Sequence, residues 1–133
     1  MPESQTYTLS IPVVMLAVAN AVLFAVGALL HSGVPIGPIE ESVNVAVTGL
    51  EAIGGLLLVL ATIGLFTAAD WSRRLARFAN TFAIASVAAV AMLLALDDDR
   101  SAAPVKAMQV LRVLFASVSL LLLYHNGRNQ AAG

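Results

Sequence analysis

The chain has 133 residues, of which 59% are hydrophobic and 11% are charged, and its mean hydropathy is +0.89. Soluble domains usually carry about 25% charged residues, so these few charges exclude an ordinary water-exposed fold and a disordered chain. A net charge of −1 also excludes a basic surface for nucleic acid. The charges are clustered, because none lies between Glu3 and Glu40, between Glu51 and Asp70, or between Arg77 and Asp97. This pattern indicates a small integral membrane protein.

Four apolar stretches are long enough to cross a bilayer as helices, which requires about 20 residues each. They are 11–30, 43–68, 78–96 and 104–124. Polar or Gly- and Pro-rich segments separate them, among them Ser32–Pro38 and Asp97–Ser101. Because backbone groups in lipid must be satisfied within their own segment, helices are the expected solution. The sequence therefore predicts one all-α domain over 1–133, an integral membrane four-helix bundle.

The distribution of Lys and Arg predicts the orientation, since short cytoplasmic loops carry an excess of both residues. Positive charges on one side are Arg73, Arg74, Arg77 and Arg128, against Arg100 and Lys106 on the other. This places both termini in the cytoplasm. Three aromatic residues, which favour the membrane interface, fall on the same side: Tyr7, Trp71 and Tyr124. We expect the protein to lie in the plasma (inner) membrane of a prokaryote.

Two opposite charges fall inside the predicted spans. Glu51 lies eight residues after Val43, and Arg112 lies eight residues after Pro104, which puts both about 12 Å into the membrane. Each charge alone costs roughly 2.5–3.5 kcal/mol or more near the centre of a helix. Pairing removes much of that cost, so we predict an ion pair between Glu51 and Arg112. The alternatives are an Arg112 that extends to the interface, or a protonated Glu51 that bonds to a hydroxyl or an amide.

Helical spacing extends this polar site. On the first span Asn20, Phe24, Gly27 and His31 share a face. The faces of three spans predict a polar pocket for a ligand or a proton relay, built from His31, Asn44, Thr48, Glu51, Gln109 and Arg112. A purely structural ion pair that fixes the helix register is the alternative. His31, Glu40 and Glu41 are ligand types for zinc or copper, although their spacing matches no motif.

The stretch from Glu51 through Gly54 and Gly55 to Leu58, followed by Gly64–Thr67 and Arg74–Ala76, resembles the second helix and following turn of the DoxX-like family. The resemblance covers roughly residues 50–94. It implies a four-helix membrane protein associated with redox complexes that act on quinols or sulfur compounds. It also implies a site role for Glu51 and packing roles for Gly54 and Gly55.

These features predict an accessory subunit of a membrane redox complex, with a polar pocket for a quinone or a bound lipid. The expected partners are the lipid bilayer and other membrane subunits or copies of the same chain, without nucleic acid. One alternative is a small proton-coupled transporter that uses Glu51, and another is a structural or assembly subunit. The sequence contains no nucleophile–base pair, phosphate-binding loop or metal motif, so we expect no enzymatic activity of its own.

Overall fold

The computed structural model describes residues 11–96 and 102–132 and contains four α-helices in these ranges. They are α1 (Ile11–His31), α2 (Val45–Phe66), α3 (Ser72–Leu96) and α4 (Ala103–Ala131). Each is long and apolar enough to cross a membrane, so the predicted all-α architecture with four such helices is confirmed. Tyr7 and the Asp97–Arg100 segment lie outside the described residues.

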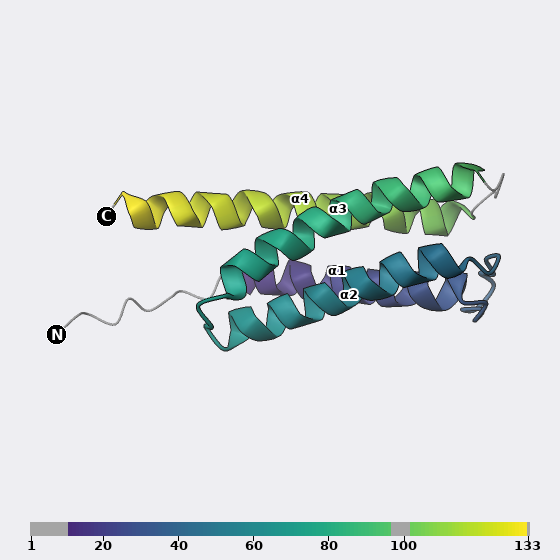
Figure 1. Ribbon diagram of the computed structural model, residues 1–133, viewed down its shortest axis with the longest axis horizontal. Helices are drawn as coiled ribbons and strands as arrows, with labels where there is room; N and C mark the ends of the chain where they lie inside the picture. The colour runs from purple at the N-terminus through teal and green to yellow at the C-terminus, as the bar shows by residue number, and fades with distance from the viewer. Residues whose placement is uncertain (1–10, 97–101, 133) are drawn as a thin grey trace.

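The helices form two layers, with α1 beside α2 and α3 beside α4 (Figure 1). Neighbouring helices also meet between the layers, α2 against α3 and α1 against α4. The other two pairs, α1 with α3 and α2 with α4, therefore lie diagonally across the bundle. We call the end where α1 stops and α2 starts the His31 end. The opposite end, where α2 turns into α3, is the Trp71 end, and there α1 begins and α4 ends (Figure 1).

Local hydrogen bonds fix the turn at the His31 end. Gly33 takes φ +91°, a conformation that favours glycine, and ends the first helix. Asn44 starts the second helix, since its side chain accepts a hydrogen bond from the backbone N–H of Val47 at 3.1 Å. The backbone N–H of Asn44 donates to the carbonyl of His31 at 2.9 Å. The start of α2 is thereby tied directly to the last residue of α1.

Two helix boundaries differ from those of the predicted spans. The third helix begins at Ser72 rather than at 78, and the fourth continues to Ala131 rather than stopping at 124. Hydropathy locates the segment that suits lipid, whereas the helical hydrogen bonds continue beyond it into the polar zone. Arg77 therefore lies within α3, and its guanidinium lies 4.9 Å from the ring centre of Tyr124 on α4. This cation–π contact joins the extended ends of the two helices.

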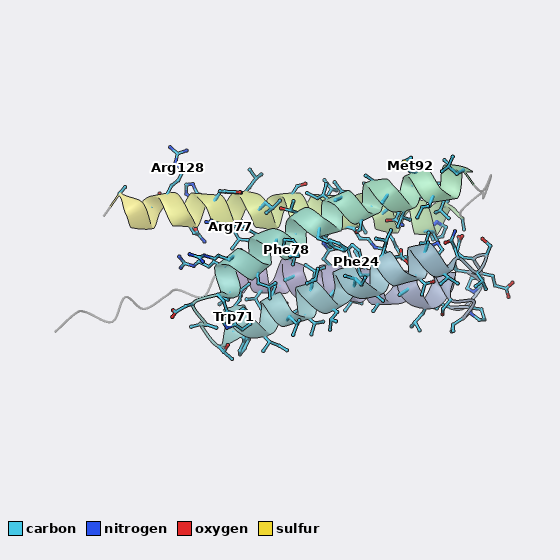
Figure 2. The ribbon with its side chains drawn as sticks, in the orientation of Figure 1. Phe24, Trp71, Arg77, Phe78, Met92 and Arg128 are labelled. Atoms are coloured by element: carbon cyan, nitrogen blue, oxygen red, sulfur yellow. The ribbon has the colours of Figure 1, made fainter. Side chains whose placement is uncertain are left out.

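Small side chains let the helices approach closely at the Trp71 end and in the middle of the bundle. A buried cluster combines alanines with a few larger apolar residues, namely Val13, Ala21, Phe24, Leu58, Ala61, Ala76, Ala79, Ala83, Val87, Ala116 and Leu123. Figure 2 shows Phe24 inside the bundle, while Trp71, Arg77 and Arg128 lie toward the Trp71 end. The closest approach in the α2–α3 turn is at Gly64, where an added Cβ would lie 2.5 Å from the Trp71 ring and 3.0 Å from the Cβ of Ser72.

We expect Gly64→Ala to displace Trp71 and to lower the free energy of unfolding by about 1–2 kcal/mol, as overpacking does elsewhere. Thermal unfolding in detergent, followed by the fluorescence of the chain's one tryptophan, measures both effects. Gly49→Ala is the matched control, because a Cβ at Gly49 meets no atom within 4 Å. Equal melting curves for the two variants would contradict the packing role of Gly64.

Candidate functional site

Glu51 and Arg112 form the ion pair that the sequence predicts. The Nη1 group of Arg112 donates to Oε1 of Glu51 at 2.5 Å. Glu51 is 0% exposed and Arg112 is 1% exposed, so the pair is shielded from the surroundings of the bundle. From the start of each helix, Glu51 is about 9 Å along α2 and Arg112 about 14 Å along α4. The charges therefore meet in the half of the bundle nearer the His31 end.

The pair crosses the diagonal of the bundle, and Gly27 on α1 makes the crossing possible. Glu51 is on α2 and Arg112 is on α4, two helices whose backbones do not pack against each other. An added Cβ at Gly27 would collide with Nη2 of Arg112 and would lie 2.5 Å from Oε1 of Glu51. The absence of a side chain at Gly27 thus leaves the space in which the two charged groups touch. No residue other than glycine leaves that space.

His31 contacts the second carboxylate oxygen of Glu51. Its Nδ1 atom lies 2.9 Å from Oε2 of Glu51 and 3.0 Å from the carbonyl oxygen of Gly27. A backbone carbonyl and an ionised carboxylate only accept hydrogen bonds, so the hydrogen is assigned to Nδ1 from this network. His31 is 0% exposed, and its Nε2 atom is buried without a hydrogen-bond partner among the described residues. Glu51 is therefore held from α1 and α4 at once.

Arg112 makes further contacts, all of them with α1 or with its own helix. Its Nη2 donates to the carbonyl of Leu23 at 2.6 Å, and its Nη1 also donates to Oε1 of Gln109 at 3.0 Å. Its guanidinium carbon lies 4.5 Å from the ring centre of Phe24, a cation–π contact. Asn20 donates from its side-chain amide to the backbone carbonyl of Arg112 at 3.2 Å. These contacts hold the positive charge in one position.

The two glycines that follow Glu51 support the same network through Phe24. An added Cβ at Gly54 would lie 2.7 Å from the Phe24 ring, and one at Gly55 would lie 3.4 Å from the Cβ of Phe24. Phe24 in turn lies beneath the Arg112 guanidinium. Gly54 therefore admits the ring that supports the partner of Glu51, whereas a Cβ at Gly55 would make only ordinary contacts with α1.

The opposite charges of Glu51 and Arg112 cancel, which is what allows them to stay in an apolar bundle. An isolated buried charge is strongly unfavourable, whereas a pair with additional hydrogen bonds recovers much of the lost hydration. Both oxygens of Glu51 are engaged, and Arg112 uses both of its terminal nitrogens. Removal of one partner would leave the other charge without compensation.

The expected open pocket is a packed network instead. Because Glu51 and His31 have no accessible surface, they border no space large enough for a water molecule. Asn44 and Thr48 serve the start of α2, where the Thr48 hydroxyl donates to the Asn44 carbonyl at 2.9 Å. A hollow of about 440 Å³ lies instead in the loop between α1 and α2, lined by Gly33, Pro35, Glu40, Glu41, Ser42 and Val43. The lining of this recess therefore does not include Glu51, His31 or Arg112.

The suggested zinc or copper site is not assembled. His31 turns inward to Glu51, and Glu41 accepts a hydrogen bond from the backbone N–H of Ala102 at 2.9 Å. Within residues 11–96 and 102–132, no three His, Asp or Glu side chains gather around one metal position. The contact of Glu41 has a different effect, because it places a carboxylate at the positive N-terminal end of α4.

The sequence pattern located part of this network. It placed Asn20, Phe24, Gly27 and His31 on one face of the first helix, and all four are buried. It did not identify Gly27 as the crossing point or the Leu23 carbonyl as an acceptor, since neither has a sequence signature. Buried Asn80 on α3 was also outside the predicted site, and Asn80 and Ser119 on α4 both hold polar atoms without partners in the described chain.

Comparisons with protein-family models, with curated proteins and with solved structures give no match to this chain. The resemblance of the second helix to the DoxX-like family therefore stays a prediction based on the residues around Glu51.

A double-mutant cycle should reveal the strength of the pair. Glu51→Leu and Arg112→Leu should each lower the free energy of unfolding by about 3–5 kcal/mol, because each leaves an uncompensated buried charge. The double variant should lose less than the sum of the single losses. Titration with a denaturing detergent in mixed micelles, followed by circular dichroism, measures all four proteins. Additive losses would mean that the two side chains act independently.

Gly27→Ala tests the crossing point itself. The new methyl group must push Arg112 away from Glu51, so we expect a loss of about 1–3 kcal/mol in the same unfolding assay. Gly49→Ala makes the same substitution at an open helical position and should show no loss. If both alanine variants are as stable as the native protein, the contact does not depend on Gly27.

Proposed function

We propose that this chain is a non-enzymatic integral membrane subunit that accompanies a membrane redox complex acting on quinols. The observation that carries the proposal is the joint role of Glu51, Gly54 and Gly55. These are the residues on which the DoxX-like resemblance rests, and they belong to one structural unit with Arg112 and Phe24. Each residue of this motif contacts Arg112 or Phe24, and this shared arrangement supports a common role for the motif in the second helix.

The charge distribution supports an orientation with both termini in the cytoplasm. At the Trp71 end, α3 begins with Arg73, Arg74 and Arg77, and Arg128 lies near the end of α4. At the His31 end, the described helices carry one Lys or Arg close to the membrane edge, Lys106. The excess of positive charge at the Trp71 end favours the cytoplasmic side for that end. The plasma (inner) membrane of a prokaryote is the location we propose.

The outer surface of the bundle suits lipid and partner helices. Large apolar side chains are exposed on every helix, for example Met15, Leu56, Phe78 and Leu121. Since the charged groups fill the interior, a quinone or lipid would bind against these outer faces, between this chain and a neighbouring subunit. This proposal replaces an internal pocket with a site shared by two proteins.

The closed network favours this role over a proton-coupled transporter that exchanges cations at Glu51. Such a carboxylate would have to be reachable by a substrate, but both of its oxygens face positively charged or N–H groups and neither has accessible surface. Arg112 would also compete with any cationic substrate for Glu51. The ion pair therefore favours a subunit that does not transport a substrate.

Deletion of this chain from its host should lower the rate of quinol-dependent electron transfer in isolated membranes severalfold, because loss of a stabilising subunit reduces the amount of an assembled complex. Native protein and Gly49→Ala should restore the rate, whereas Glu51→Leu should not. An unchanged rate in the deletion membranes would refute the redox role. Full restoration by a Glu51→Leu and Arg112→Leu double variant would instead favour a purely structural subunit.

A further inference from the structure

We propose that His31 is a proton-binding site, with Nε2 as the acceptor atom. This inference goes beyond the redox role and does not depend on it. It starts from the one ring nitrogen of His31 that the buried network leaves unused.

The tautomer follows from the contacts of the other nitrogen. Nδ1 faces the Gly27 carbonyl and the Glu51 carboxylate, so it carries a hydrogen and donates to both. The lone pair of the neutral ring is therefore on Nε2, a buried atom without a partner in the described chain. A buried acceptor without a hydrogen bond is unfavourable. A proton on Nε2 would also lack a partner in the described chain, so the stabilisation of the protonated ring comes from its charge-assisted hydrogen bond through Nδ1 to Glu51.

The size of the site restricts what it can bind. His31 and Glu51 have no accessible surface, so a small organic molecule or a metal ion with its own ligands would have to force the helices apart. A proton needs no such space. The proton on Nε2 would form an imidazolium beside an existing carboxylate, so that Glu51 would lie between two cations, one on each oxygen.

The charges around His31 come from several elements. Burial of the ring is the largest effect and disfavours its protonated form, whereas Glu51 on α2 favours it, and the carboxylate of Glu41 in the α1–α2 loop also acts on it electrostatically. Arg112 on α4 opposes it, and so does the more exposed Lys106 on the same helix. The charged residues of α3 are at the opposite end of the bundle. The two carboxylates thus act on the ring from the His31 end and from α2, while Arg112 lies farther from the His31 end.

A recess at the His31 end lies in the loop that directly follows His31, although His31 itself is not part of its lining. Two of the lining residues are Glu40 and Glu41. Glu41 connects the recess to the start of α4 through its bond to Ala102. The recess therefore adds carboxylates to the end of the bundle where His31 lies.

Nitrogen-15 NMR of histidine-labelled protein in phosphatidylcholine vesicles tests the proposal directly. The chain has two histidines, and His125→Gln leaves His31 as the only labelled ring. His125 is exposed and lies outside the network, so this variant keeps the site intact. We expect one hydrogen, on Nδ1, at high pH, and a second one on Nε2 as the pH falls, with helicity unchanged. A ring that stays neutral with one hydrogen from pH 8 to pH 4, in folded protein, would overturn the proposal.

Variants of the carboxylates then identify what holds the proton. In the His125→Gln background, Glu51→Gln should lower the midpoint of the His31 titration by about one to three pH units, since a neighbouring opposite charge is lost. Glu40→Gln is the matched control and should leave the midpoint within a few tenths of a unit, because Glu40 is exposed. Should Glu51→Gln unfold the protein, the carboxyl carbon shift of Glu51 in the native chain decides instead. Proton uptake at Glu51 rather than at Nε2 would contradict the assignment.

Discussion

The structure depends on one constraint, which is that a carboxylate buried in an apolar helix bundle must be neutralised and hydrogen-bonded. Glu51 satisfies this constraint through Arg112 from α4 and His31 from α1. Three helices are thereby tied at one point, including two that otherwise lie diagonally apart. The hydrophobic effect gives little preference for one helix arrangement within lipid, so such a point is well placed to select this one.

The surroundings of the pair are adapted to it through small and aromatic residues. Gly27 leaves the space where the charges meet, while Gly54 admits the Phe24 ring beneath the guanidinium. Glycine costs stability in the middle of a soluble helix, but here close approach is worth more than helix propensity. The same group of residues links the short motif of the second helix to a physical task. It also explains why the polar interior is packed and why a lipophilic ligand would be expected on the outside.

The network combines an ion pair that locks the helices together with a histidine that can titrate. Glu51 and Arg112 cancel each other and hold the helices, which requires that neither be exchanged for a substrate. His31 adds a titratable ring to this lock, and Nε2 is the atom at which we propose that it takes up a proton.

The sequence alone predicted four helices that are each long enough to cross a membrane, because a span requires about 20 apolar residues. It also indicated the Glu51–Arg112 pair, since two opposite charges at matching depth have few other partners in lipid. It placed the start of α3 too late and the end of α4 too early, because hydropathy marks the lipid-facing segment and not the limits of the hydrogen-bonded helix. Only the tertiary structure showed that Glu51 and Arg112 meet beside Gly27 and that His31 contacts the second carboxylate oxygen of Glu51. It also showed that the polar side chains of the three helices pack against one another. Those facts depend on how the helices rotate and approach one another, which residue spacing along a single helix does not specify.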